Sequence, residues 1–250
     1  MPNQPRATFE QLGENNWNYA KRQFDIPKRS TVFFCDFLDK KQLMKPGHHL
    51  VDFGAGAGAV IHYMAGKHPD IRFTGVELNP ELVEYGNRRF HDDHLEDRCR
   101  LIQGDCYNPN PDLLGNVDGI FSVQTIMVLN DIQALIDAVT NLRPKWFAAN
   151  SLFFDGNVDA KVEINDYTDP LKGGGYTIRP YNIWSIPRIH ERFAAKGYTE
   201  FQSLPFEIDM DLPKPNGGGM GTYTETLRNG KRIQISGPLL MSWYFLFASR

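Results

Sequence analysis

The 250-residue sequence is poor in cysteine and has no long apolar segment. Its three cysteines, Cys35, Cys99 and Cys106, form no CxxC pair and no paired framework, which favours a reducing compartment. No apolar run approaches the roughly 20 residues that cross a membrane, and the N-terminus lacks the apolar core of a signal peptide. We therefore expect a cytoplasmic protein that makes no membrane contact.

The sequence also lacks an excess of positive charge. Its 27 basic and 30 acidic residues give a net charge of −3, and there is no long basic run. Binding to nucleic acid usually leaves a basic footprint, so no nucleic-acid partner is expected. The contents of 41% hydrophobic and 23% charged residues are ordinary for a globular chain and exclude the disordered and fibrous classes. Nothing in the sequence predicts an oligomeric state.

The segment 50–58 organises the chain, because an apolar strand that carries Asp52 runs directly into Gly54, Gly56 and Gly58. Glycine lets a ligand approach the backbone closely, so a strand that ends in alternating glycines predicts a cofactor loop. A second apparent strand, 71–77, ends in Glu77, whose carboxylate suits both hydroxyls of a ribose. A third apparent strand is followed by Asp105.

Seven segments have strand character: about 48–53, 71–77, 99–104, 117–123, 146–152, 199–208 and 239–248. The first five alternate with segments of helical periodicity, which predicts a doubly wound, mostly parallel sheet in an α/β fold. In such a sheet the ligand groups gather at the carboxyl ends of the strands.

The strand-end acids and glycines resemble those of the class I S-adenosylmethionine-dependent methyltransferases. The resemblance extends from about residue 50 to the C-terminus. The resemblance implies a Rossmann-like seven-stranded sheet with an antiparallel last strand. It also implies S-adenosylmethionine as the cofactor, with the glycine loop at its methionine end, Glu77 at the ribose and Asp105 beside the adenine. The cofactor residues expected on this basis are Asp52, Gly54, Ala55, Gly56, Gly58, Glu77, Leu78, Asp105, Cys106, Ser122, Gln124, Trp17 and Tyr19.

Helical periodicity at 7–22 and 29–44 predicts two helices before the first strand. We expect an N-terminal helical cap over residues 1–45, followed by a methyltransferase domain over 46–250. The resemblance implies that the cap closes over the cofactor through Trp17 and Tyr19, although simple packing against the sheet explains the same pattern.

Two insertions interrupt the second half, at about 155–183 and 211–232. Alternating residues on either side of the glycines 173–175, and again around the turn 228–230, predict two inserted hairpins. Both leave the sheet at its carboxyl edge, so they should overhang the cofactor and form the acceptor pocket.

The expected chemistry is an in-line displacement at an already activated methyl group, for which positioning and exclusion of water are the main requirements. Ser122 and Gln124 should lie near the reacting centre, and Asp155, Glu163 and Asp166 are candidate bases. Arg179, Tyr181 and Tyr223 are candidate acceptor ligands, and Lys172 and Lys214 are further cations that could orient an anion. A metal site at His91, Asp92 and His94 is chemically conceivable, but a solvated helix end is favoured and no metal is predicted.

Residues 180–185 and 235–240 resemble small-molecule methyltransferases of bacterial surface-polysaccharide biosynthesis. We therefore expect methyl transfer to an oxygen of a small sugar-derived or anionic acceptor, with N-methylation as the nearest alternative. The glycine loop also fits the fingerprint of nicotinamide or flavin oxidoreductases, and a non-catalytic module that keeps the pocket is a third possibility.

Overall fold

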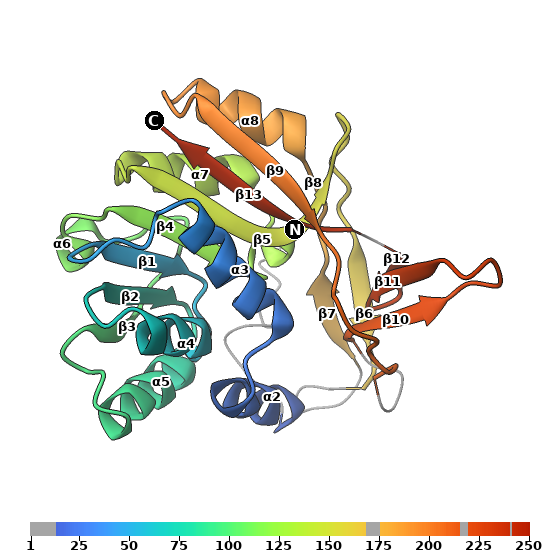
Figure 1. Cartoon of the computed structure of the whole chain (residues 1–250), viewed down its shortest axis with the longest axis horizontal. Coiled ribbons are helices and arrows are strands. Elements are labelled where there is room, and N and C mark those ends of the chain that lie inside the picture. The colour runs from blue at the N-terminus through green and yellow to red at the C-terminus, as the bar shows by residue number, and fades with distance from the viewer. Residues whose placement is uncertain (1–13, 169–175, 216–219, 241) are drawn as a thin grey trace.

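Figure 1 shows the computed structural model of the chain, which describes residues 14–168, 176–215, 220–240 and 242–250. The main sheet has eight strands, in the order β3-β2-β1-β4-β5-β13-β9, and the short β8 pairs with the end of β5. The bounds of these strands are β1 His49–Phe53, β2 Arg72–Glu77, β3 Cys99–Gln103, β4 Gly119–Val123, β5 Trp146–Phe154, β8 Trp184–Ser185, β9 Glu200–Phe206 and β13 Trp243–Ser249.

The first five of these strands pair in parallel, and the chain crosses from one side of β1 to the other between β3 and β4. β13 lies between β5 and β9 and runs antiparallel to both. The predicted doubly wound sheet with an antiparallel last strand is therefore confirmed, and the two-residue β8 is an addition to it.

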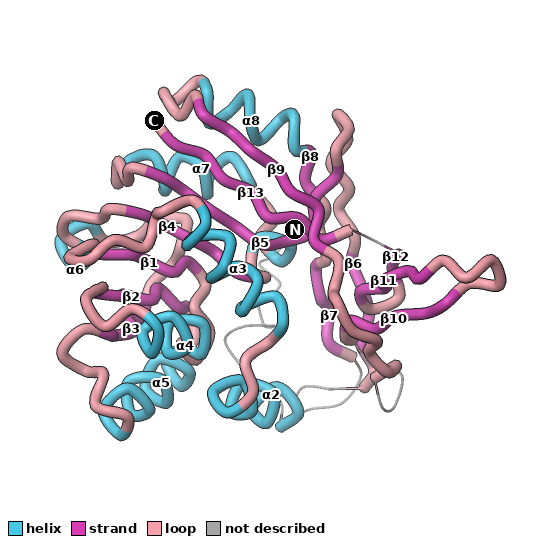
Figure 2. The backbone as a smooth tube through the Cα atoms, in the orientation of Figure 1, coloured by secondary structure: helices cyan, strands magenta, loops and turns pink. Residues whose placement is uncertain are grey.

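Helices cover both faces of the sheet, as Figure 2 shows. One buried cluster joins a face of the sheet to α2–α5, and a second joins the other face to α6–α8. The helix bounds are α2 Glu14–Asp25, α3 Arg29–Lys40, α4 Ala59–Lys67, α5 Pro80–Asp92, α6 Pro111–Leu114, η1 Ile126–Val128, α7 Ile132–Asn141 and α8 Ile186–Ala194.

Side-chain caps fix where several helices begin. The Asn79 carboxamide accepts hydrogen bonds from the amides of Glu81 and Leu82, and Asp131 accepts one from Ala134. Ser185 does the same for Arg188 at the start of α8. Each cap satisfies amides that have no partner inside the helix, so the starts of α5, α7 and α8 are explained locally.

The two insertions form separate small sheets beyond the carboxyl end of β5 (Figure 1). β6 (Glu163–Asp166) and β7 (Thr177–Pro180) form one hairpin, and β10 (Thr222–Thr226), β11 (Arg232–Ser236) and β12 (Leu239–Leu240) form a three-stranded sheet. Both predicted hairpins are therefore confirmed. The glycines 173–175, Lys172 and residues 7–13 of the first predicted helix lie outside the described residues, and the domain boundary at residue 45 stays a prediction.

No helix in the described parts of the chain is both long and apolar enough to cross a membrane.

Candidate functional site

The glycine loop between β1 and α4 is held by backbone hydrogen bonds to the neighbouring strand. The amides of Gly54 and Ala55 both donate to the Val76 carbonyl, at 2.9 and 3.2 Å. Gly56 has φ +56°, and a Cβ added to it would meet nothing within 4 Å. Because this conformation is strained for residues with side chains and the space in front of it is open, the loop forms a cradle with its backbone exposed.

Glu77 connects the ends of β1 and β2. Its carboxylate accepts hydrogen bonds from the Gly56 amide at 2.8 Å and the Asn79 amide at 2.9 Å. Burial raises the pKa of Glu77, against the opposing effect of the Asn79, Gly56 and Leu78 amides. A carboxylate has about four acceptor positions, so Glu77 retains capacity for the two hydroxyls of a ribose.

Asp52 is the least satisfied acid of the site. It is 1% exposed, and among the described residues its Oδ1 has no hydrogen-bond partner. Burial, reinforced by the negative charge of Glu77, raises the pKa of Asp52 well above its ordinary value. An unsatisfied buried carboxyl beside an open glycine cradle is the environment that a cationic ligand group would complete.

The end of β3 brings Asp105 and Cys106 to the same edge. Asp105 accepts a hydrogen bond from the Tyr107 amide at 2.9 Å, and Cys106 is buried. Leu78 is half-buried at the end of β2, and its carbonyl accepts a bond from Gln103. The three strand ends therefore present their predicted ligand groups on one side of the sheet.

Two predicted residues at the end of β4 have different surroundings. Ser122 is fully buried, and its hydroxyl donates to the Phe53 carbonyl at 2.8 Å, which ties β4 to β1. Gln124 has φ +60°, and its Oε1 accepts a hydrogen bond from the Lys28 ammonium at 2.5 Å. Its Nε2 donates to the Ser30 hydroxyl at 2.9 Å. Gln124 thus joins the end of β4 to the start of α3.

Two predicted aromatic residues lie close to this contact. The Lys28 ammonium is 4.6 Å from the centroid of the Tyr19 ring. Tyr181 is buried at the end of the β6–β7 hairpin; burial and then the neighbouring Tyr19 raise its pKa to about 12. The structure therefore brings Tyr19 and Gln124 to Lys28 and places Tyr181 near Tyr19, although these four residues come from separate parts of the chain.

The remaining predicted residues have other neighbours among the described residues. Trp17 packs edge-on against Tyr85 of α5, with ring centroids 5.7 Å apart. Asp155 is exposed after β5, and Tyr223 on β10 lies beneath the Lys214 ammonium, 5.3 Å from its ring centroid. Arg179 donates to Asp166 within the β6–β7 hairpin at 2.8 Å. Their roles in catalysis or binding stay predictions.

Sequence analysis missed Lys28, Ser30 and Thr125. The Thr125 hydroxyl donates to the Gly54 carbonyl at 2.9 Å, and a Cβ on Gly54 would lie 2.2 Å from the Thr125 methyl group. Lys28 and Ser30 contact Gln124 across 96 and 94 residues. No local pattern in the sequence reports contacts of that range.

The strand order and the acid and glycine positions together define the class I methyltransferase fold. Residues 50–145 match the family model described as a methyltransferase domain. The chain is 27% identical over 146 residues to malonyl-[acyl-carrier protein] O-methyltransferase of Acetivibrio thermocellus, covering 58% of this chain and 47% of that protein. It is 30% identical over 196 residues to sterol 4-C-methyltransferase strm-1 of Caenorhabditis elegans, and this match covers 76% of this chain and 55% of that protein.

Among solved structures, geranyl diphosphate C-methyltransferase of Streptomyces coelicolor A3(2), in complex with Mg²⁺, geranyl diphosphate and S-adenosyl-L-homocysteine, superposes with a TM-score of 0.52. The two chains are 16% identical, and the match covers 88% of this chain and 77% of that one. The chain therefore has the fold of the class I S-adenosylmethionine-dependent methyltransferases, and its residues 50–145 match a methyltransferase domain. It spans about half the length of the curated relatives it matches.

Proposed function

We propose that this chain is an S-adenosylmethionine-dependent methyltransferase that methylates an oxygen atom of a small sugar-derived or anionic acceptor. The observation that carries the proposal is the edge formed by Asp52, Gly56 and Glu77, where a buried unsatisfied acid and a ribose-type acid flank an open glycine cradle. The match of residues 50–145 to a methyltransferase domain supports a methyl donor over the dinucleotide that the glycine spacing alone would also accept.

The residues present fit the methyl donor group by group. The Asp52 carboxyl suits the donor's ammonium group, since a buried acid gains most from a positively charged partner. Glu77 suits the ribose hydroxyls, and Asp105 with Cys106 suits the adenine. The donor supplies a methyl group on a positive sulfur, which is already activated for displacement.

The chain's own residues then have to orient the acceptor and exclude water. Lys28 is half-buried beside Gln124 and can orient a carboxylate or phosphate, while the Tyr19 and Tyr181 hydroxyls can bond to a sugar. A carboxylate or phosphate is already a competent nucleophile and needs no base. The acceptor expected from these residues is therefore a small polar anion or a sugar bearing one.

A binding assay tests the cofactor, and a turnover assay tests the activity. S-adenosylhomocysteine should raise the melting temperature of the purified protein, and NAD should not. Incubation with the donor and a panel of sugar phosphates, nucleotide sugars and carboxylic acids should then yield a methylated product. If the protein binds S-adenosylhomocysteine but methylates neither the panel nor any compound in a metabolite extract, a non-catalytic module is favoured. If it methylates only amines, RNA or protein, the proposed acceptor is wrong.

Lys28→Met tests the acceptor site separately. Loss of a cation that orients an anionic acceptor should raise KM for that acceptor about tenfold or more, in line with about 1.5–3 kcal/mol for a hydrogen bond to a charged group. Affinity for S-adenosylhomocysteine should be unchanged. Lys45→Met, at an exposed lysine before β1, is the matched control and should alter neither quantity.

A further inference from the structure

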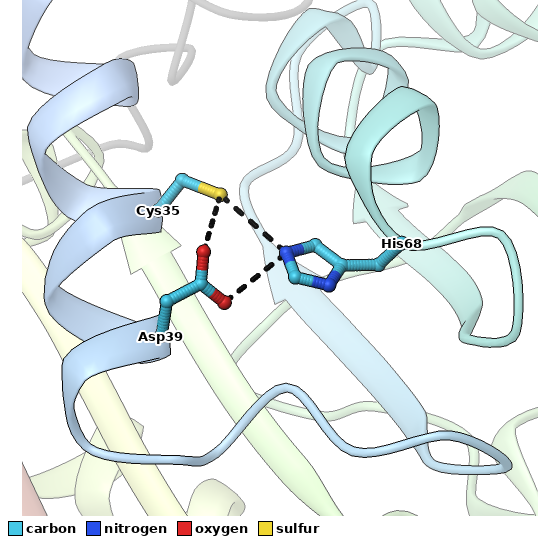
Figure 3. A group of neighbouring side chains, drawn as sticks. All are labelled: Cys35, Asp39 and His68. Carbon is cyan, nitrogen blue, oxygen red and sulfur yellow. Dashed lines mark hydrogen bonds and ion pairs between the residues drawn. The ribbon is translucent and has the colours of Figure 1, made fainter.

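Three side chains with metal-binding atoms converge between α3 and the end of α4, as Figure 3 shows. Cys35 and Asp39 come from α3, and His68 follows the last residue of α4. The Cys35 Sγ lies 3.9 Å from the His68 Nε2 and 3.9 Å from the Asp39 Oδ2, and the His68 Nε2 lies 3.1 Å from the Asp39 Oδ1.

These separations are close to those around a tetrahedral zinc ion. Bonds of about 2.0–2.3 Å to sulfur, nitrogen and oxygen at tetrahedral angles place the ligand atoms roughly 3.3–3.6 Å apart. The Cys35–His68 distance of 3.9 Å exceeds this range by a few tenths of an ångström. The two Asp39 distances involve different carboxylate oxygens, but one ligand atom from each residue lies within 4.8 Å of the others, so side-chain rotations can bring a single Asp39 oxygen to the ion. Thiolate, imidazole and carboxylate are also ligand types that ions of borderline softness accept.

The backbone holds the three residues in place. Cys35 and Asp39 are four residues apart on one helix and therefore share a face. The His68 amide donates to the Met64 carbonyl, and the Arg98 guanidinium donates to the carbonyls of both His68 and Ala65. The donor atoms are thus preorganised before any ion arrives, which lowers the cost of binding one.

We propose that Cys35, Asp39 and His68 bind a divalent metal ion, of which Zn²⁺ is the best match, with water in the fourth position. The Cys35 side chain is buried, whereas the side chains of His68 and Asp39 are 20% and 38% exposed, so an ion and a water molecule can reach the site. Three protein ligands plus solvent is an established zinc arrangement.

Binding requires the thiol to lose its proton. The metal–sulfur bond forms as the S–H bond breaks, and the proton passes to solvent. Burial, with the nearby Asp39 charge, raises the pKa of Cys35 to about 12, against the opposing Lys67 ammonium, so the ion has to displace this proton. Lys67 is itself paired with Asp36 at 3.5 Å, which reduces its repulsion of a cation.

An ion at this position would join α3 to the turn between α4 and β2. That turn leads into the start of β2, whereas the glycine cradle and Glu77 lie at the opposite, carboxyl edge of the sheet. The proposed ion would therefore act as a structural clip, and its presence is independent of the proposed methyl transfer.

Cobalt titration of the full chain, after treatment with a chelator, tests the site directly. Co²⁺ should produce the near-ultraviolet charge-transfer absorption of a cobalt–thiolate bond, and Zn²⁺ should abolish it by competition. Cys35→Ser should remove the absorption. Asp39→Asn and His68→Gln should weaken metal affinity by at least the roughly 10–100-fold that follows loss of an outer partner.

Cys99→Ser is the matched control, because Cys99 is equally buried but lies on β3. It should leave the absorption unchanged. Zn²⁺ should also raise the melting temperature of the wild type and of Cys99→Ser, but not of Cys35→Ser. The absence of charge-transfer absorption in the wild-type protein, or its persistence in Cys35→Ser, would overturn the proposal.

Discussion

Asp52 and Asp166 are both buried carboxylates, but their surroundings are opposite. Among the described residues Asp52 Oδ1 has no partner, and burial raises its pKa. Asp166, on β6, accepts bonds from the Thr168 amide and hydroxyl and from Arg179, at 2.9, 2.7 and 2.8 Å. These partners outweigh the effect of burial and lower the pKa of Asp166.

The comparison distinguishes a region whose buried acid a bound ligand would pair from a region whose buried acid is already paired within the protein. At the carboxyl edge of β1 and β2, the unsatisfied Asp52 precedes a loop in which Gly56 has open space in front of its backbone. In the insertions, charges pair with one another, as Lys214 does with Glu225 at 2.5 Å. Ligand binding should therefore depend strongly on the first region, whereas changes in the second should act mainly on stability or on the acceptor.

Gly56→Val should have the largest effect on donor binding. A β-branched side chain would enter the open cradle and would also adopt a left-handed conformation, at a cost of roughly 1–3 kcal/mol. We expect affinity for S-adenosylhomocysteine to fall at least about a hundredfold, or about 2.7 kcal/mol, by isothermal titration calorimetry.

Gly230→Val is the matched control for Gly56→Val. Gly230 has φ +79° and open space around it, but it lies in the exposed turn between β10 and β11. The strain should be similar and the melting temperature should fall, while donor affinity stays unchanged. Equal losses of affinity in the two variants would remove the distinction between the regions.

Glu77→Ala should have the next largest effect. It removes the charged acceptor proposed for the ribose hydroxyls and the partner of the Gly56 and Asn79 amides. Donor binding should weaken by about 1–3 kcal/mol, measured by calorimetry. Glu225→Ala, which removes an acid of the β10 strand, should leave affinity unaltered, and the assignment of Glu77 fails if both variants bind equally well.

Asp52→Asn should weaken donor binding by about 1 kcal/mol, because a neutral amide still accepts a hydrogen bond from the ammonium group. In the ligand-free protein, by contrast, Asp52→Asn should increase the free energy of unfolding. A raised pKa means that the folded state keeps the proton longer than the unfolded state, so wild-type stability declines as pH rises above the ordinary aspartate range.

Denaturant unfolding of Asp52→Asn at acidic and at mildly basic pH measures this decline. The variant should be more stable than the wild type at the higher pH, and the difference should shrink toward pH 4. Asp70→Asn, at an exposed acid before β2, should show no such trend. A ligand-free variant that is less stable than the wild type at high pH would contradict the unsatisfied state of Asp52.

The elements that form the proposed cofactor edge were predictable because the information for them is local. Glycine spacing, an acid at each strand end and the caps at Asn79 and Asp131 each act within a few residues. The doubly wound parallel sheet was predicted from the alternation of strands and helices, and the two inserted hairpins from alternating residues and turn residues.

The surroundings of Gln124 were not predictable, because its contacts with Lys28 and Ser30 cross almost a hundred residues. The same holds for the Cys35, Asp39 and His68 cluster, whose histidine is 29 residues from Asp39 and on a different element. Sequence analysis also had no basis for choosing between a solvated Arg179 and one paired with Asp166. Contacts of this kind depend on how helices and insertions pack, which composition and periodicity do not specify.

Asp166→Ala should have the smallest effect on donor binding and a clear effect on stability. It removes the acceptor of three hydrogen bonds inside the β6–β7 hairpin, so the free energy of unfolding at pH 7 should fall by about 1–3 kcal/mol. A lowered pKa contributes stability above the ordinary aspartate range and loses it as pH falls through the folded value. The difference from the wild type, measured by urea unfolding, should therefore shrink on acidification, as for Asp52→Asn, but with the opposite sign: Asp166→Ala should be less stable than the wild type, whereas Asp52→Asn should be more stable. If Asp166→Ala instead lowers donor affinity as much as Glu77→Ala does, the hairpin takes part in cofactor binding and the two regions are one site.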